Sequence, residues 1–200
     1  MFLEPHFKGQ RSGWIEVICG AMFSGKTEEL IRRLNRARIA HQAVVVVKPA
    51  LDTRYRHDQV VSHNANSLAA IPVEQSGELL DCARDAEVLG IDEAQFFDMD
   101  LHRHCQTLAM KGVRVIAAGL DMDYRGEPFG PMPMLLAVAE YITKVHAICQ
   151  HCGNLATHSF RLLPDTDAIL LGEQEAYEAR CRTCFAMGNI LPLKPPGRKS

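Results

Sequence analysis

The chain has 200 residues, 47% of them hydrophobic, which is enough to bury the core of one ordinary domain beside a small second unit. Its 22 basic and 24 acidic side chains give a net charge of −2, which argues against nucleic acid as a partner. No apolar run reaches roughly 18 residues and the first residues lack a signal-peptide core, so we expect a cytoplasmic protein without a membrane partner.

A glycine-rich loop follows the first predicted strand, which spans residues 14–19. The loop matches the pattern GxxxxGK[ST] and precedes an amphipathic helix predicted over residues 28–41. Its glycines let successive main-chain N–H groups turn toward phosphate oxygens, and the helix N-terminus adds partial positive charge. Lys26 would reach the β- and γ-phosphates, and the Thr27 hydroxyl would hold Mg²⁺. The loop consists of Gly20, Ala21, Met22, Phe23, Ser24, Gly25, Lys26 and Thr27.

Strands and helices alternate along the chain after this loop. The pattern predicts strands at 43–48, 71–73, 88–92 and 113–120, and helices at 77–84 and 99–110. Continuous apolar strands of this kind are typical of a parallel sheet that is covered on both faces. We therefore predict an α/β fold of P-loop (RecA-like) type, with a mostly parallel sheet and helices on both faces.

Two acidic residues, Asp92 and Glu93, end the strand predicted at 88–92. In phosphate-loop enzymes an aspartate at this place orders Mg²⁺, usually through water. Ligands of parallel sheets bind in the crevice outside the carboxyl ends of the strands, where Glu93 can accept a proton from the group that attacks the γ-phosphate. Arg54 is a candidate for catalytic charge neutralisation, and a solvated loop arginine is an equally good interpretation of it.

Four cysteines form two CxxC pairs in the C-terminal part of the chain, Cys149 with Cys152 and Cys181 with Cys184. Four thiolates complete a closed tetrahedral zinc site, which leaves no position for water and is therefore structural. A redox-active CxxC is the alternative, although that chemistry needs one pair rather than two. We interpret the remaining cysteines as small core residues, namely Cys19, Cys82 and Cys105.

The sequence pattern changes near residue 145, where cysteine pairs and polar turns replace the strand–helix alternation. A small zinc-ribbon-like domain is expected there, because a unit of this size needs a metal to remain folded. The predicted organisation is a flexible arm at 1–13, a P-loop ATP-binding α/β domain at 14–145, a zinc-binding domain at 146–191 and a disordered tail at 192–200.

Taken together, these motifs resemble those of the type II thymidine kinases, the zinc-containing enzymes of human-cytosolic and bacterial type. The resemblance covers about residues 14–185, in the family's order and spacing. Tyr124 stands where phenylalanine is common in the family, so its hydroxyl group needs a partner or water. The matching segments are 20–27, 52–55, 92–97, 119–130, Tyr177 and the four paired cysteines.

The resemblance implies Mg²⁺-dependent transfer of the ATP γ-phosphate to the 5′-hydroxyl of thymidine, a step of nucleotide salvage and DNA precursor synthesis. It makes Glu93 the acceptor of the hydroxyl proton. The ATP side would be lined by residues 20–27 with Asp92, Glu93, Ala94 and Gln95. The nucleoside would contact Met22, Leu120, Tyr124, Phe129 and Tyr177, and a lasso loop with Ala168, Ile169, Leu170, Leu171 and Gly172. A homotetramer and feedback inhibition by thymidine triphosphate (dTTP) are further expectations.

Two other classes of function share parts of this pattern. A RecA-like nucleotide hydrolase would use Glu93 to activate water and would turn over ATP without a nucleoside. A zinc-ribbon nucleic-acid-binding module would use basic residues near the second cysteine pair, of which Arg180, Arg182 and Lys194 are examples. Its binding would depend strongly on salt.

Overall fold

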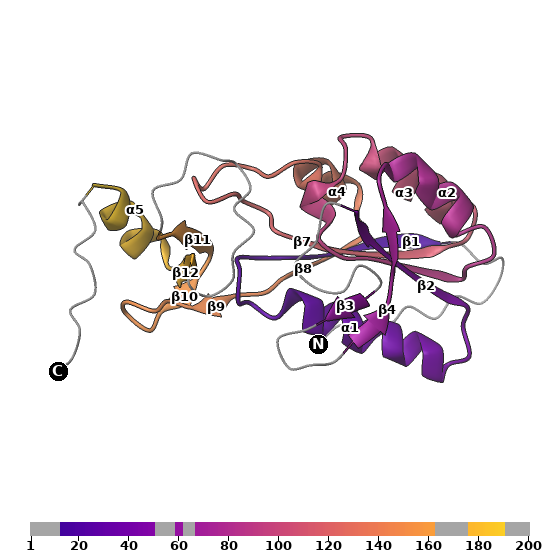
Figure 1. Cartoon of the computed structure of the whole chain (residues 1–200), viewed down its shortest axis with the longest axis horizontal. Helices are drawn as coiled ribbons and strands as arrows, with labels where there is room; N and C mark the ends of the chain where they lie inside the picture. The colour runs from indigo at the N-terminus through magenta and orange to yellow at the C-terminus, as the bar shows by residue number, and fades with distance from the viewer. Residues whose placement is uncertain (1–12, 51–58, 62–66, 163–175, 191–200) are drawn as a thin grey trace.

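The computed structural model describes residues 13–50, 59–61, 67–162 and 176–190. Within these residues six parallel strands form the central sheet, in the order β5-β2-β6-β7-β1-β8 (Figure 1). The strands are β1 (Trp14–Cys19), β2 (Val44–Pro49), β5 (Ile71–Val73), β6 (Val88–Ile91), β7 (Arg114–Gly119) and β8 (Tyr141–Lys144). The four middle strands are mostly apolar, as suits strands that helices cover on both faces.

The helices divide between the two faces of the sheet (Figure 1). On one face α1 (Lys26–Ile39) packs Leu30 and Leu34 against strand residues such as Ile116. The other face is covered by the remaining helices of this part, which are η1 (Ser76–Glu78), α2 (Leu79–Cys82), α3 (Leu101–Met110) and α4 (Met132–Val138), with η2 (Ala94–Phe96) between β6 and α3. This arrangement confirms the predicted α/β fold.

A smaller group of elements lies beside the sheet, at the end where α1 begins (Figure 1). It contains β9 (Ala147–Ile148), β10 (Leu155–Ala156), β11 (His158–Arg161), β12 (Tyr177–Arg180) and α5 (Arg182–Ile190). The strands pair in antiparallel fashion, β10 with β9 and β11 with β12. A third antiparallel pair, β3 (Gln59–Val61) with β4 (Ser67–Ala69), places Leu68 in the core on the α1 side.

A buried ion-pair network fastens β1 to its neighbours. Glu16, which is fully buried, accepts hydrogen bonds from Arg33 Nη1 at 2.7 Å and from Arg114 Nε at 2.6 Å. Arg33 is also fully buried, and its Nη2 donates to Thr143 Oγ1 at 2.8 Å. One carboxylate thus joins β1, α1 and β7, and Arg33 extends the network to β8.

The element boundaries follow the sequence pattern with small shifts. The first helix begins at Lys26 rather than residue 28, because the end of the phosphate loop already forms its first turn. The helix α3 ends at Met110, two residues before Gly112. Gly112 has a φ of +92°, a positive value of the kind that commonly terminates a helix. The sequence analysis identified neither α4 nor β8, since each is short and its pattern is weak. Most of the predicted arm and tail lies outside the described residues.

Candidate active site

The phosphate loop connects β1 to α1, as its pattern predicts. Gly20 has a φ of +149°, and a Cβ atom there would lie 2.2 Å from the Val145 carbonyl oxygen, so only glycine fits. Gly25 has a φ of +84° and directly precedes the helix. Lys26 Nζ donates to the Ala21 carbonyl oxygen at 2.9 Å, which folds the lysine back over the loop. Strand, loop and helix N-terminus therefore form an arrangement suited to phosphate.

Asp92 and Glu93 follow the last residue of β6, at the same edge of the sheet. Because β6, β7 and β1 are adjacent and parallel, the end of β6 and the start of the phosphate loop are separated by one strand only. Glu93 has a left-handed backbone with φ of +50°, which costs a non-glycine residue about 1 kcal/mol or more. Strain of this kind is common where a side chain is held for function.

The segment 119–130 packs against the turn that contains Glu93. The Leu120 N–H donates to Gln95 Oε1 at 2.9 Å, and the Phe129 ring meets the Phe96 ring edge-on with centroids 5.6 Å apart. The Tyr124 hydroxyl accepts a hydrogen bond from Arg125 Nε at 2.8 Å, which supplies the partner that the sequence analysis required.

Arg161 was missed by the sequence analysis and joins two of the predicted nucleoside contacts. It is 7% exposed, and its Nη2 donates to the Tyr177 hydroxyl at 2.8 Å. Its guanidinium group lies 3.8 Å from the centre of the Tyr124 ring, in cation–π geometry. The pairing of Arg161 with Tyr177 across β11 and β12 creates this contact, and no local sequence spacing indicates it.

Two parts of the predicted site lie outside the described residues. These are Arg54, and the lasso segment with Ala168, Ile169, Leu170, Leu171 and Gly172. Their roles stay predictions. The other predicted residues belong to the phosphate loop, the turn after β6, the segment 119–130 and β12.

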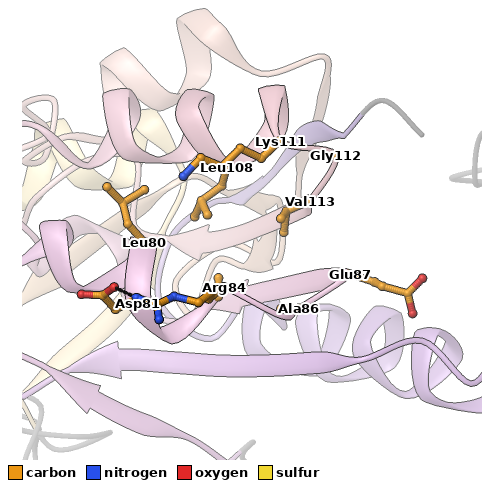
Figure 2. Close-up of a pocket in the computed structure, with 10 residues that line it drawn as sticks. Leu80, Asp81, Arg84, Ala86, Glu87, Leu108, Lys111, Gly112 and Val113 are labelled. Carbon is orange, nitrogen blue, oxygen red and sulfur yellow. Dashed lines mark hydrogen bonds and ion pairs between the residues drawn. The ribbon is translucent and has the colours of Figure 1, made fainter. Parts of the chain in front are cut away.

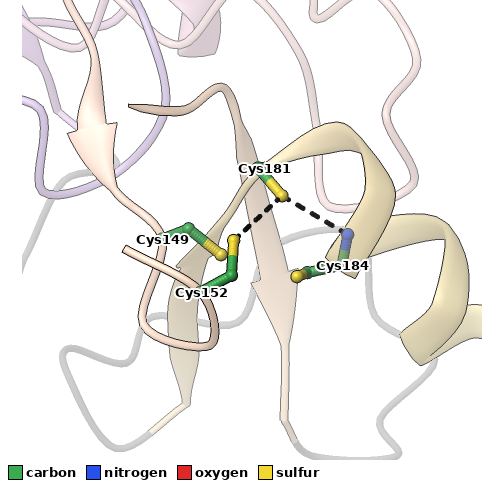
Figure 3. Close-up of side chains that lie close together, drawn as sticks. All are labelled: Cys149, Cys152, Cys181 and Cys184. Atoms are coloured by element: carbon green, nitrogen blue, oxygen red, sulfur yellow. Dashed lines mark hydrogen bonds between the residues drawn. The ribbon is translucent and has the colours of Figure 1, made fainter. Parts of the chain in front are cut away.

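The four paired cysteines converge on one point (Figure 3). Their Sγ atoms all lie within 4.8 Å of one another, and those of Cys152 and Cys181 are 3.5 Å apart. Four thiolates at about 2.3 Å from a zinc ion would be separated by about 3.8 Å, so the cluster can hold a metal of that size. Both pairs contribute to it, which a redox site built on one pair would not require.

The environment of the cluster lowers the thiol pKa at Cys149 and Cys181, whereas contacts with the neighbouring thiols raise the pKa of Cys184. Burial alone would raise the pKa of the Cys149 thiol, but hydrogen bonds from the main-chain N–H groups of Cys181, Cys152 and His151 lower it to about 6. His151 itself is exposed and lies 3.2 Å from Glu178 through its Nε2. Outside the cluster, burial raises the pKa of the Cys105 thiol to about 12. Cys105 and Cys19 are core residues, as predicted, and Cys82 is partly buried against the core.

The phosphate loop touches the cysteine cluster through one side chain. Phe23 has a φ of +63°, and its ring packs against the small apolar group that surrounds the thiols. That group contains Ala147, Cys149, Ala156 and Ala179, with Cys181 and Cys184 at its border. The cysteine cluster and the phosphate loop are therefore in contact through side-chain packing.

A separate hollow of about 340 Å³ lies at the other end of the sheet's strands, where β6 and β7 begin (Figure 2). Its wall includes Glu87 and Val113, the residues just before β6 and β7 begin. Arg84 and Lys111 add positive charge to it, and Asp81 pairs with Arg84 at 2.7 Å. The phosphate loop follows the carboxyl end of β1 and Glu93 follows that of β6, whereas this hollow lies where β6 and β7 begin, so it is not part of their site.

Comparison with known proteins gives one consistent result. The thymidine kinase family model matches residues 13–185. A thymidine kinase of Bacteroides thetaiotaomicron is 53% identical over 186 residues, which cover 92% of this chain and 94% of the relative. A thymidine kinase of Rhodothermus sp. is 58% identical over 177 residues, which cover 88% of this chain and 83% of the relative. A thymidine kinase of Coprothermobacter proteolyticus is 56% identical over a region that covers 86% of this chain and 89% of the relative. Among the described helices, none is long and apolar enough to cross a membrane.

Proposed function

The chain belongs to the thymidine kinase family, and on this basis we propose that it transfers phosphate at the carboxyl edge of its central sheet. Its reaction converts ATP and thymidine to ADP and thymidine monophosphate. The observation that supports this location is the position of the phosphate loop after β1 and of Glu93 after β6, with only β7 between these strands. Phosphoryl transfer depends mainly on such positioning and on charge neutralisation.

ATP would bind with its phosphates against the main-chain N–H groups of residues 20–27. Lys26 would leave the Ala21 carbonyl oxygen and contact the β- and γ-phosphates. Thr27 and, through water, Asp92 would hold Mg²⁺, which when bound neutralises charge on the transferred phosphate. The residues Asp92, Glu93, Ala94 and Gln95 would form the neighbouring wall.

Glu93 would act as the proton acceptor for the nucleoside. As the 5′-oxygen of thymidine forms its bond to the γ-phosphorus, the hydroxyl proton passes to the Glu93 carboxylate. The bond between the γ-phosphorus and the bridging oxygen breaks, and ADP leaves with that electron pair. Arg54, on the segment after β2, would add positive charge near the transferred group.

The nucleoside would lie between the segment 119–130 and the β11–β12 pair. Tyr124 and Tyr177 would contact it from these two sides, and Arg161 fixes both rings through its contacts. Leu120, Phe129, Met22 and the lasso residues 168–172 complete the expected contacts. The base would therefore be recognised by a pocket formed from segments distant in sequence.

The cysteine cluster would hold Zn²⁺ in a structural role. When bound, the ion would cross-link Cys149 and Cys152 to Cys181 and Cys184, and so join the segment before β10 to the start of α5. We further expect a homotetramer that is inhibited by dTTP. Sedimentation with and without dTTP, and initial rates at increasing dTTP, test these two expectations.

The decisive experiment is ATP turnover by the purified chain with Mg²⁺, measured with and without thymidine. With thymidine we expect labelled thymidine monophosphate, and without nucleoside we expect little phosphate release. Steady phosphate release without thymidine would favour the hydrolase instead. A salt-dependent gel shift on single- and double-stranded DNA tests the nucleic-acid-binding alternative, and a panel of nucleosides then defines the substrate range.

A further inference from the structure

We propose that Gln95 is a positioning residue, which holds the Glu93 carboxylate and couples it to the nucleoside-binding segment 119–130. The inference rests on the proposed role of Glu93 as proton acceptor. Gln95 lies in η2, two residues after Glu93, and is only 2% exposed. Its Nε2 donates to Glu93 Oε2 at 2.5 Å, and its Oε1 accepts from the Leu120 N–H at 2.9 Å.

These two partners determine the orientation of the Gln95 amide. The Leu120 N–H is a donor and must face the amide oxygen, whereas the Glu93 carboxylate is an acceptor and must face the amide nitrogen. Exchanging the two ends of the amide would break both hydrogen bonds. A glutamate at position 95 would instead place a second negative charge against Glu93, so glutamine is the side chain that satisfies both neighbours.

The backbone around Gln95 leaves this side chain little freedom. A Cβ atom on Gly119 would lie 2.8 Å from Gln95 Oε1, so β7 ends directly against the amide. A Cβ atom on Gly130, whose φ is +49°, would lie 2.3 Å from the Gln95 carbonyl oxygen. Both ends of the segment 119–130 therefore lie directly against Gln95. A larger side chain at either glycine would displace Gln95.

This geometry gives Gln95 a direct effect on the reaction. Its hydrogen bond holds the Glu93 carboxylate in one orientation, and misplacement of a reacting group by about 1 Å can reduce the rate by about 10²-fold. Since Leu120 holds the other end of the amide, any movement of the segment 119–130 on nucleoside binding reaches Glu93 through Gln95.

The test compares Gln95→Met and Gln95→Glu with Gln106→Met, an exposed glutamine on α3 that serves as the matched control. Methionine keeps the length of the side chain and removes both hydrogen bonds, and glutamate keeps the shape but removes the donor. We expect kcat to fall by about 10²-fold in Gln95→Met, with KM for ATP changed less than about two-fold. Gln95→Glu should lose kcat as well, because its carboxylate repels that of Glu93 instead of holding it, and KM for ATP should again change less than about two-fold.

A double-mutant comparison separates this inference from the proposed function. If Gln95 acts through Glu93, Gln95→Met should cause almost no further loss of kcat in the Glu93→Gln background. Full activity of Glu93→Gln alone would overturn the proposed role of Glu93, and the inference with it. If Glu93→Gln is inactive while both Gln95 variants keep the kcat of the parent, the proposed function stands and the inference is wrong. Should Gln95→Met fail to fold, the kcat of Gln95→Glu and its KM for ATP decide.

Discussion

The main-chain N–H of Met22 donates a hydrogen bond to Ser159 Oγ at 3.0 Å, across 137 positions of sequence. This bond fastens the phosphate loop to β11, the strand that also carries Arg161. Ser159 is 4% exposed, so the bond is protected from water. Together with the packing of Phe23 against the cysteine cluster, it makes the shape of the phosphate loop dependent on the β9–β12 elements.

Replacement of Ser159 by alanine should weaken this attachment. The Met22 N–H would lose its buried acceptor, which costs about 1–3 kcal/mol of unfolding free energy in a site of this kind. We expect KM for ATP to rise several-fold while kcat changes less. Denaturant unfolding and initial rates measure the two effects. Thr107→Ala removes a hydroxyl that bonds within α3 and is the control; equal behaviour of the two variants would contradict the attachment.

Glu93→Gln should retain binding of ATP and thymidine but lose at least about 10²-fold in kcat, since the amide cannot accept the proton. Isothermal titration and steady-state rates separate binding from turnover. Glu74→Gln, at an exposed glutamate that directly follows β5, is the control. Turnover close to that of the parent would remove Glu93 from the role of proton acceptor.

Cys152→Ser should lower the zinc content of the chain and disorder the region 150–185, because a closed site needs all four thiolates. Elemental analysis gives the stoichiometry, and hydrogen exchange reports the order of the region. Since Phe23 packs beside the cluster, amides of the phosphate loop should also exchange faster. Cys82→Ser, outside the cluster, should leave zinc unchanged. One zinc per chain in Cys152→Ser would show that the ligand assignment is wrong.

Arg33→Met tests the buried ion-pair network. The substitution would leave the fully buried Glu16 carboxylate without its Arg33 partner, which typically costs about 3–5 kcal/mol of unfolding free energy. Arg36→Met, at an exposed arginine on the same helix, should change stability by less than about 0.5 kcal/mol. Urea unfolding compares them. A similar small loss in both variants would mean that the network contributes little.

Acid should destabilise the protein partly through Glu29. A hydrogen bond from Arg32, and further interaction with Arg33, lower the pKa of Glu29 from about 4.5 to about 2 despite partial burial. Because the folded state holds this proton less tightly than the unfolded state, the contribution is present above pH 4.5 and is lost as pH falls toward 2. In Glu29→Gln, unfolding free energy should therefore depend less on pH across this window. An unchanged pH dependence would contradict the assignment.

The sequence predicted the sheet and its phosphate loop because both depend on local signals. Continuous apolar strands such as 88–91 indicate burial on two faces, and the glycines at positions 20 and 25 suit the positive φ values found there. The sequence pattern did not predict the short or weakly patterned elements, among them α4 and β8. The pairing of Glu16 with Arg33 was also not predicted, since charged residues in amphipathic segments normally face solvent.

The sequence by itself determined the class of fold, the phosphate loop, the acidic end of β6 and the cysteine quartet, since each is encoded by residues near one another or at a characteristic spacing. Only the tertiary structure decided that Gln95 lies between Glu93 and Leu120, that Arg161 joins Tyr124 to Tyr177, and that Ser159 holds Met22. These contacts link segments up to 137 positions apart, and their partners are set by strand order and packing rather than by local sequence.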